Sequence, residues 1–325
     1  MRQRFVGRSG LQVSRIGLGT MTWGRDTDEY EAREQLTSFV DAGGTLLDTA
    51  ASYGASEELV GALIGEVVAR DDVVLATKAG IVARGETWTT DVSRGRLLTT
   101  LDRSLSRLGT DYVDLWQIHT WLPGLPLDET LSAVDLAVAS GRARYAGISN
   151  YCGWQTAKAA GWQQAWPGRS QLVSTQVEYS LLQRGIEREV VAAADDFGLG
   201  ILAWAPLAAG VLTGKYRSGT PSDSRGAVAE LSADVGAHLD ERGRGIVDAV
   251  CKAADGLGLA PVEVALAWVR DRPGVTAPIV GARTAGQLRS TLTAEDVELP
   301  AEIVAALDDV SAIGVGYPER LRGSG

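Results

Sequence analysis

Cysteine and histidine are scarce in this chain of 325 residues, which contains two of each: Cys152, Cys251, His119 and His238. So few thiol and imidazole groups argue against a disulfide framework and against a structural zinc site. We therefore expect no metal, and a chain that works in a reducing compartment. If imidazole chemistry occurs in this protein, either His119 or His238 must carry it.

Positive charge and long apolar runs are also in short supply. The chain has 31 Lys and Arg against 41 Asp and Glu, a formal net charge of -10 at pH 7, which argues against a partner with a phosphate backbone. No apolar run approaches the roughly 18 residues that a membrane-spanning helix needs. No apolar segment of signal-peptide length follows the basic start at residues 1–7. We expect a cytoplasmic protein that binds neither nucleic acid nor a membrane.

Short apolar runs alternate with longer amphipathic segments along the whole chain. Nearly continuous apolar strands are typical of parallel strands covered by helices, and parallel neighbours need helix-length crossovers. No Pro-, Gly- or Ser-rich linker divides the sequence. The pattern predicts a single (β/α)8 barrel, the TIM-barrel fold of the α/β class, over residues 1–325. The eight expected strands are residues 15–18, 45–48, 73–77, 112–118, 144–148, 172–177, 200–204 and 277–280.

Two segments lie outside this repeating pattern. Residues 4–6 and 11–13 flank a turn sequence at 7–10, which predicts an N-terminal β-hairpin that closes one end of the barrel. The polar stretch at residues 217–238 predicts an inserted loop. The competing fold, a doubly wound sheet, requires G-x-G-x-x-G after the first strand, and this chain has Thr22 in place of the third glycine.

Titratable side chains fall at the carboxyl ends of consecutive expected strands. Asp48 ends the second strand, Lys78 follows the third and His119 follows the fourth. Because barrel active sites form at this end, these side chains are expected to meet Tyr53, which lies in the loop after the second strand. A lysine ammonium stabilises a neighbouring phenolate, so we expect the pKa of Tyr53 to lie below its usual value of roughly 10. Tyr53 is then a usable proton donor.

Each of these residues also has an ordinary structural interpretation. Asp48 is a potential helix cap, Lys78 a solvated strand end, and His119 a satisfied interior side chain. Side chains with purely structural roles have no reason to gather at one end of the barrel. Their joint placement therefore favours an active site. His238 lies in the polar insertion without such neighbours and is expected at the surface.

The same residues belong to motifs that resemble those of the aldo-keto reductases, which are NADPH-dependent oxidoreductases built on a (β/α)8 barrel. The resemblance implies that Tyr53 is the proton donor and that Lys78 and Asp48 tune it. It also implies that His119 orients and polarises the carbonyl group. The implied reaction is the reduction of an aldehyde or ketone to an alcohol, with a small carbonyl compound as the partner. The matching segments are residues 17–21, 48–53, 77–78, 117–119, 147–150, 176–182 and 278–283.

The resemblance implies an NADPH site along the barrel mouth. Ser149, Asn150 and Gln176 would bind the nicotinamide carboxamide, and Trp204 would stack on the nicotinamide ring. Arg283 would bind the 2′-phosphate, because a guanidinium offers phosphate a fork of donors. The residues implied at the pyrophosphate, in the first loop and around the adenosine are Ala205, Pro206, Leu207, Ala208, Lys215 and Arg225, then Gly19, Thr20 and Met21, then Gly281 and Gln287.

Tryptophan is unusually frequent, at nine residues against three phenylalanines. Trp23 and Trp121 lie in loops that a barrel brings to its mouth, and we expect them to form an aromatic wall for the carbonyl substrate. Trp88 fits either that wall or internal packing. The spacing of Trp154, Trp162 and Trp166 predicts one face of a helix, used for packing or for a subunit contact.

Two other functions stay open. A strand-end lysine in a barrel can form a Schiff base, so Lys78 also fits an aldolase or lyase. The resembled family includes potassium-channel β subunits, which makes a cofactor-binding regulatory role the other alternative, although those subunits carry asparagine where this chain has His119. Related members often place an acidic residue and an asparagine against the adenine, where this chain has Ser290 and Thr291. Arg283 keeps NADPH as the expected cofactor, and the sequence assigns no oligomeric state.

Overall fold

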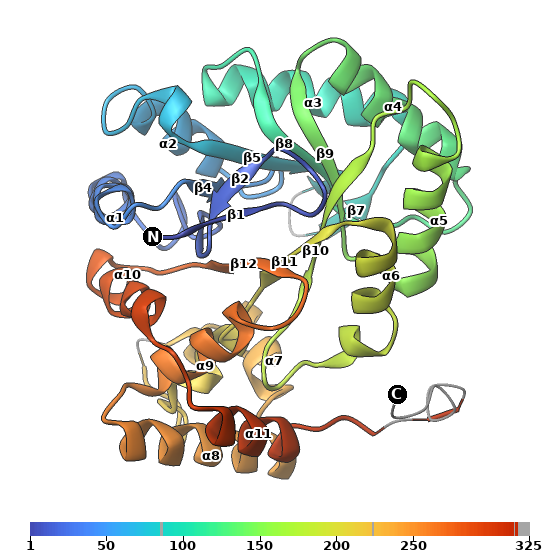
Figure 1. Cartoon of the computed structure of the whole chain (residues 1–325). Coiled ribbons are helices and arrows are strands. Elements are labelled where there is room, and N and C mark those ends of the chain that lie inside the picture. Colours follow the sequence, from blue (N-terminus) through green and yellow to red (C-terminus); the bar gives the residue numbers. More distant parts are fainter. Residues whose placement is uncertain (85–86, 223, 315, 318–325) are drawn as a thin grey trace.

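A closed barrel of strands forms the centre of the chain. The computed structural model describes residues 1–84, 87–222, 224–314 and 316–317. Within them, parallel strands close into a barrel in the order β3, β4, β5, β8, β9, β10, β11 and β12, and β12 pairs back to β3 (Figure 1). The strands are β3 Gly17–Gly19, β4 Leu46–Asp48, β5 Val74–Ala79, β8 Val113–Ile118, β9 Ala143–Ser149, β10 Leu172–Glu178, β11 Gly200–Trp204 and β12 Val275–Val280. The predicted (β/α)8 barrel is confirmed.

Helices surround the barrel and cover its outer face. In α3, leucines recur at helical spacing, and Leu97, Leu101 and Leu105 are buried in the core that the helices share with the strands. The helix ends at Gly109, whose φ of 62° is the left-handed conformation that favours glycine. The helices are α1 Glu29–Asp41, α2 Ser56–Leu63, η1 Arg70–Asp72, α3 Arg94–Leu108, α4 Leu127–Ala139, α5 Gly153–Gln164, η2 Gly185–Arg188, α6 Val190–Phe197, η3 Ala208–Thr213, η4 Arg225–Ala227, α7 Ala229–Gly236, α8 Glu241–Leu257, α9 Pro261–Arg270, α10 Ala285–Leu292, η5 Thr293–Asp296 and α11 Ala301–Val310.

The N-terminal hairpin closes one end of the barrel. Its strands, β1 (Gln3–Phe5) and β2 (Gln12–Ser14), pair antiparallel, each one residue away from its predicted position. Val6, Leu11 and Val13 are buried against the side chains that fill the barrel interior. Burying apolar side chains of this size stabilises a structure by about 1.5–3 kcal/mol each, which holds the hairpin in place. The interior side chains of this cluster are Leu46, Ala76, Leu115, Val173, Leu202, Ala277 and Ile279.

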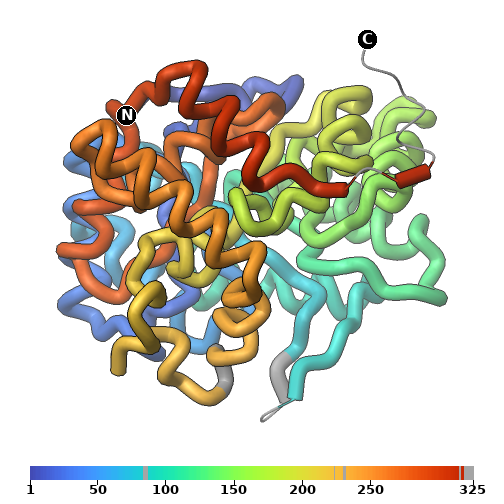
Figure 2. Tube along the Cα trace, turned by 90° about the horizontal axis from the view of Figure 1, so that it is seen from below, coloured from blue at the N-terminus to red at the C-terminus, as the bar shows by residue number. Residues whose placement is uncertain are grey.

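Two further segments extend from the opposite end of the barrel. β6 (Ile81–Arg84) and β7 (Thr87–Thr90) form a second antiparallel hairpin, which the sequence analysis did not anticipate. Figure 2 shows this hairpin, in cyan, and the segment around α7, in gold, on the same side of the molecule. The described residues of the 217–238 insertion include η4 and α7, so the expectation of an irregular loop there is wrong.

Apolar anchors explain why this insertion is ordered despite its polar composition. Tyr216 and Val235 are buried and belong to the main core cluster. The backbone N–H of Gly226 donates a hydrogen bond of 3.2 Å to the Tyr216 hydroxyl. Two buried side chains therefore fix a segment whose remaining residues are mostly polar.

Two of the three tryptophans expected on one helix face share a helix. Trp154 and Trp162 lie in α5, but the helix ends at Gln164, before Trp166. Trp166 precedes Pro167, and a residue before proline is disfavoured in the helical region. Trp154 and Trp166 are 56% and 60% exposed, so neither packs in the core.

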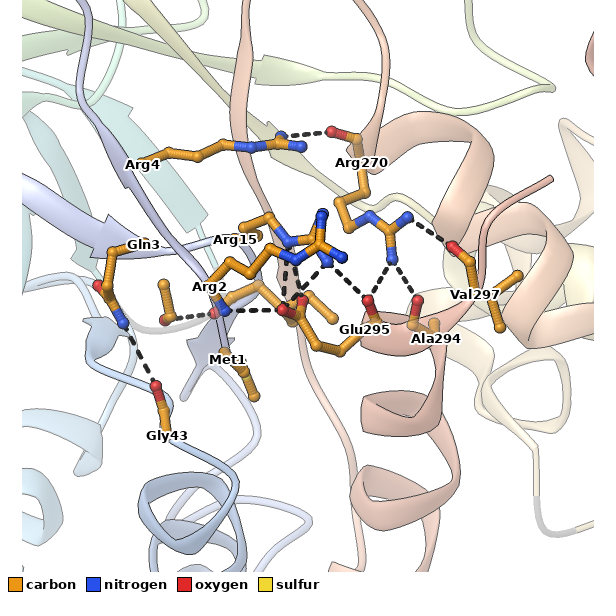
Figure 3. A network of polar contacts seen from close by, with 12 residues as sticks. Met1, Arg2, Gln3, Arg4, Arg15, Gly43, Arg270, Ala294, Glu295 and Val297 are labelled. Carbon is orange, nitrogen blue, oxygen red and sulfur yellow. Dashed lines mark hydrogen bonds and ion pairs between the residues drawn. The ribbon is translucent and has the colours of Figure 1, made fainter. Parts of the chain in front are cut away.

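A buried network of charged groups joins the two ends of the chain (Figure 3). Arg15 donates from Nε to both carboxylate oxygens of Glu295, at 3.1 and 3.2 Å, and from Nη2 to its backbone carbonyl at 2.7 Å. Arg270 donates to the same carbonyl at 2.9 Å. The backbone N–H of Arg2 donates to Glu295 Oε1 at 2.8 Å. Glu295 therefore holds η5 against the segment that leads into β3.

Replacing Glu295 by alanine is expected to lower the free energy of unfolding by about 3–5 kcal/mol, because Arg15 loses its buried counter-charge and keeps only the more exposed Asp271, at 4.0 Å. Unfolding by urea, followed by circular dichroism, measures the loss. The matched control is Glu298→Ala, which removes a surface pair with Arg2 whose side chains are 70% and 80% exposed. That control is expected to cost under about 1 kcal/mol. Equal losses in the two variants would contradict a special role for Glu295.

Candidate active site

A large cavity opens at the carboxyl ends of the barrel strands. Its volume is about 1440 Å³, which exceeds the roughly 300–1,000 Å³ of an ordinary small-molecule site. It therefore has room for a cofactor and a substrate together. The predicted site residues that line it are Gly19, Met21, Asp48, Tyr53, His119, Ser149, Asn150, Gln176, Trp204, Ala205, Pro206, Leu207, Lys215, Arg225, Gly281, Arg283 and Gln287.

A buried ion pair lies beneath this cavity. Lys78 Nζ, on β5, donates to Asp48 Oδ2, on β4, at 2.6 Å and to the backbone carbonyl of Thr49 at 2.9 Å. The second carboxylate oxygen of Asp48 accepts a hydrogen bond of 2.8 Å from Gln176 Nε2, on β10. Burial by itself lowers the pKa of Lys78, but the Asp48 carboxylate and the Tyr53 phenol outweigh burial, so this pKa lies above its usual value. Lys78 therefore keeps its positive charge at neutral pH.

Tyr53 lies beside this ion pair, in the loop after β4. Its ring centroid is 5.1 Å from Lys78 Nζ and 5.9 Å from the ring centroid of His119. Burial raises the pKa of Tyr53 above its usual value, and the Lys78 ammonium offsets only part of that increase. The expectation of a lowered pKa is wrong, because removal from water disfavours the phenolate more than one ammonium favours it. The phenol consequently stays protonated at neutral pH.

His119 follows β8 and faces Tyr53 edge to face, at an interplanar angle of 77°. Burial and the Lys78 ammonium lower the pKa of His119 to about 3, so its imidazole is neutral. Among the described residues, His119 Nδ1 has no hydrogen-bond partner. The backbone carbonyl of His119 accepts a hydrogen bond of 3.0 Å from Asn150 Nδ2. A neutral imidazole carries one N–H, which it can donate to an oxygen in the cavity.

Hydrogen bonds between neighbouring strand ends fix the amide groups of the cavity wall. Trp204 Nε1 donates to Asn150 Oδ1 at 3.0 Å, and Ser149 Oγ donates to the backbone carbonyl of Gln176 at 2.9 Å. Asn150 has a φ of 58°, a left-handed conformation that non-glycine residues rarely adopt. Since strained backbone of this kind gathers at functional sites, the arrangement marks this wall as one.

A second left-handed stretch follows β11. Ala205, Ala208, Ala209 and Gly210 have φ values of 48°, 47°, 54° and 88°. Backbone N–H groups in turns of this kind can form concave anion sites. The Lys215 ammonium lies 3.0 Å from the position that a Cβ on Gly210 would occupy. The N–H groups of Ala208 and Gly210 already donate within the loop, to the carbonyls of Ala205 and Leu207, so the remaining backbone donors and the Lys215 ammonium are what this loop offers an anion.

Arginine side chains gather in another part of the cavity. Arg225 comes from η4, Arg283 from the loop between β12 and α10, and Arg25 from the loop after β3. Burial, and then the Arg25 guanidinium, lower the pKa of Arg225. The backbone N–H of Arg283 donates to Gln287 Oε1 at 3.0 Å. Arg25 was not among the residues predicted at this site, although its position shortly after the first barrel strand was an available signal.

Two residues predicted in the first barrel loop lie away from the cavity. Thr20 is buried, and its hydroxyl donates to the backbone carbonyl of Asp48 at 3.1 Å. Trp23 is fully buried in the core, where its Nε1 donates to Gln35 Oε1 at 3.1 Å. The expectation that Trp23 forms a substrate wall is wrong, because its large ring is used to anchor the loop to α1.

Two further predicted contacts are likewise absent from the cavity lining. Ala208 is buried and does not reach the cavity, unlike its neighbours in the same loop. Trp121 packs edge to face against Tyr151 and Trp154, at centroid distances of 5.2 and 5.3 Å, so its ring belongs to an aromatic cluster instead. Trp88, on β7, does line the cavity and is 62% exposed. Of the two roles open to Trp88, the structure favours the cavity wall, and the second hairpin supplies this aromatic side chain.

His238 lies in the cavity lining, so its expected place on the open surface is wrong. The insertion folds back over the barrel mouth and leaves the His238 side chain 15% exposed, with Nε2 3.8 Å from Glu178 Oε1. Burial lowers the pKa of His238, and the carboxylates of Asp234 and Asp240 oppose this effect. His238 and Glu178 thus bring titratable groups to the wall formed by α7.

The part of the chain that the structure describes shows no grouping of three or more His, Cys, Asp or Glu side chains able to hold a metal ion. None of its helices combines the length and the apolar character needed to cross a bilayer. The expectations of no metal and of a cytoplasmic location stay predictions.

The whole barrel matches a known protein family. The model of the Aldo/keto reductase family fits residues 15–312, from the segment before β3 to the end of α11. The chain belongs to the aldo/keto reductase family. The resemblance inferred from the sequence motifs is thereby confirmed. Members of this family are oxidoreductases and typically use a nicotinamide cofactor.

Curated relatives of this aldo/keto reductase cover almost its full length. The "Uncharacterized oxidoreductase YrpG" of Bacillus subtilis (strain 168) is 38% identical over 95% of this chain and 96% of its own. The "Probable voltage-gated potassium channel subunit beta" of Oryza sativa subsp. japonica is 33% identical over 98% of this chain and 98% of its own. The "L-glyceraldehyde 3-phosphate reductase" of Escherichia coli O157:H7 is 33% identical over 97% of this chain and 93% of its own.

The stability of this aldo/keto reductase is expected to fall between pH 7 and pH 5, in part through His119. The folded-state pKa of about 3 lies below the ordinary 6.5, so between these values the unfolded chain binds more protons and acid favours unfolding. The contribution of His119 over this range is about 2 kcal/mol. His119→Asn should show an acid-dependent loss that is smaller by about this amount, measured by urea unfolding at both pH values.

The control for this measurement is His238→Asn. His238 is less shielded and has Asp234 and Asp240 beside it, so its replacement should change the acid-dependent loss less. The same pH dependence in His119→Asn and in the unsubstituted chain would contradict a neutral, buried His119.

Proposed function

We propose that this aldo/keto reductase is an NADPH-dependent carbonyl reductase, which reduces an aldehyde or ketone to an alcohol with Tyr53 as the proton donor. The observation that carries the proposal is the meeting of Tyr53 and His119 above the buried pair of Asp48 and Lys78. Asp48 and Tyr53 come from the end of β4, Lys78 comes from β5, and His119 comes from the end of β8. All four line one cavity or lie directly beneath it. Family membership supports an oxidoreductase, and this geometry supports the class of substrate.

The cavity wall offers groups that suit NADPH. The left-handed loop at 205–210 and the Lys215 ammonium suit a pyrophosphate, which needs backbone donors and positive charge. Arg283 suits the 2′-phosphate. Trp204 and Asn150, which are hydrogen-bonded to each other, would hold the nicotinamide. A donor set of this kind fits an anionic dinucleotide.

The chain's own residues would manage the proton and the charge on the substrate oxygen. Bound NADPH supplies the hydride that reduces the carbonyl carbon. The oxygen gains negative charge and takes the proton of the Tyr53 phenol, which its raised pKa keeps in place until then. Neutral His119 would donate its N–H to the same oxygen and orient it. The Lys78 ammonium, held by Asp48, would stabilise the phenolate until solvent returns a proton.

Replacing Tyr53 by phenylalanine should lower kcat by a factor of about 100 to 10,000, the usual worth of a positioned general acid. The measurement follows NADPH absorbance with a panel of aldehydes, ketones, quinones and keto-sugars, with NADH in parallel. NADPH binding should be retained, because the substitution removes one hydroxyl and keeps the ring. Near-normal turnover in Tyr53→Phe would show that Tyr53 is not the proton donor.

The state of Lys78 argues against a Schiff-base aldolase. A lysine nucleophile must be neutral and must reach the carbonyl carbon. Lys78 has a fully shielded side chain, and its Nζ is engaged by Asp48 and by the carbonyl of Thr49. Its raised pKa keeps it protonated.

Borohydride reduction in the presence of carbonyl substrates is accordingly expected to leave no adduct on Lys78. Mass spectrometry of the intact and digested chain provides the measurement. The matched control is a surface lysine such as Lys158, which reports non-specific labelling. A substrate adduct on Lys78, above the level on Lys158, would favour the aldolase instead.

A regulatory role is the second candidate, because a rice relative is named as a probable potassium-channel subunit. Such a role needs cofactor binding but no proton donor. The presence of His119 and Tyr53 with their ion pair therefore favours catalysis. Tight NADPH binding without oxidation by any member of the carbonyl panel would support the regulatory role.

A further inference from the structure

The loop after β3 forms a tight turn that the core holds in one place. The backbone N–H groups of Arg25, Asp26 and Thr27 all donate to the carbonyl of Thr22, at 3.1, 2.9 and 3.0 Å. Trp23 anchors the turn by its burial in the core and by its bond to Gln35 on α1. The conformation around Arg25 is therefore set by the fold.

Threonine hydroxyls fasten this turn to the loop that carries Arg283. Thr22 Oγ1 donates to the backbone carbonyl of Ala282 at 3.0 Å. Thr27 Oγ1 lies 3.0 Å from Thr22 Oγ1 and 3.3 Å from the backbone carbonyl of Arg283. Both threonines are almost completely buried, so these bonds form away from competing water. The two loops, far apart in the sequence, are thus held together.

Arg25, Arg225 and Arg283 line the same part of the cavity. The side chain of Arg25 is 48% exposed, and its Nε and Nη2 both donate to Asp26 Oδ2. The positive charges of Arg25 and Arg283 repel the Arg225 guanidinium, and the Asp26 carboxylate attracts it. Guanidiniums that face one another repel, and an anion bound among them removes that repulsion. The arrangement therefore suits a ligand group with more than one negative charge.

We propose that Arg25 is a specificity-determining residue which, together with Arg283, binds the 2′-phosphate of NADPH and so makes the chain prefer NADPH to NADH. This inference rests on the proposed function, since it assumes that the cavity binds a nicotinamide dinucleotide. The turn at 22–27 places Arg25, and the hydroxyls of Thr22 and Thr27 are positioning groups that hold it beside Arg283. The same guanidinium could instead meet the pyrophosphate, which NADH also carries, and the test separates these two phosphates.

The test measures equilibrium binding to the full chain by isothermal titration calorimetry. The ligands are NADPH and NADH, together with adenosine 2′,5′-bisphosphate and adenosine 5′-monophosphate, whose binding is independent of turnover. Arg25→Ala should weaken NADPH and the bisphosphate by about tenfold or more, as expected for a charge-assisted hydrogen bond. Binding of NADH and the monophosphate should change by less than about twofold. The control is Arg103→Ala, which removes an exposed guanidinium on α3 outside the cavity lining.

The outcomes separate the inference from the proposed function. Equal weakening of NADPH and NADH would place Arg25 at the pyrophosphate and overturn the inference. Unchanged binding of all four ligands to Arg25→Ala would overturn it as well, while leaving the proposed function intact. Failure of the unsubstituted chain to bind NADPH would overturn both.

The hydrogen bonds by which Thr22 and Thr27 hold the turn to the Arg283 loop, here called the threonine tether, give a second test. This test includes rescue by a conservative substitution. Thr27→Val keeps the shape of the side chain but removes the hydroxyl, so the ratio of NADPH to NADH affinity should fall toward that of Arg25→Ala. Thr27→Ser restores the hydroxyl and should restore the ratio. A purely structural role would lower the stability of both variants without changing the ratio. An unchanged ratio of NADPH to NADH affinity in a folded Thr27→Val variant would show that the threonine tether does not position Arg25.

Discussion

The barrel closes where β12 pairs with β3, and this seam positions the loops at both ends of the barrel. Two residue pairs define its register, Ile279 with Gly17 and Val280 with Leu18. Gly17 lets the two strands and Leu46 pack closely, because a Cβ there would lie 2.7 Å from Ile279 Cδ1 and 2.9 Å from Leu46 Cδ2, and both side chains would have to shift. Since β3 is short, the seam has little pairing of its own and depends on contacts at each of its ends. Those contacts decide where the loops on either side of the barrel lie.

The two ends of this seam are held by different chemistry. At the closed end, the carboxylate of Glu295 accepts from the guanidinium of Arg15 and from the backbone N–H of Arg2, and this buried ion pair stabilises the fold. At the open end, the hydroxyls of Thr22 and Thr27 bridge the loops after β3 and β12. These hydroxyl–carbonyl bonds add no charge to a region where the guanidiniums of Arg25, Arg225 and Arg283 lie near one another, with the Asp26 carboxylate paired to Arg25. The chain's overall negative charge therefore coexists with a locally positive cavity wall.

Burial acts in opposite directions on neighbouring groups of the candidate active site. It keeps Tyr53 protonated and His119 unprotonated, so each can donate a hydrogen bond or a proton to an oxygen. Lys78 stays charged in the same surroundings only because the Asp48 carboxylate lies 2.6 Å from it. Gln176 then fixes the other oxygen of that carboxylate, which links the ion pair to the wall where the nicotinamide would lie. The protonation states follow from these contacts and not from the residue types alone.

The order of strands and helices can be predicted from the amino-acid sequence, because apolar alternation is a local pattern. The place of Asp48 and His119 at one end of the barrel can be predicted too, because a barrel fixes where each strand ends. The use that the loops make of their side chains became visible in the folded chain. Trp23 is buried while Arg25, two residues later, reaches the cavity, and His238 is folded over the mouth. Such choices, like the direction of the Tyr53 pKa, depend on exposure to solvent, and exposure is set by contacts between segments that are distant in sequence.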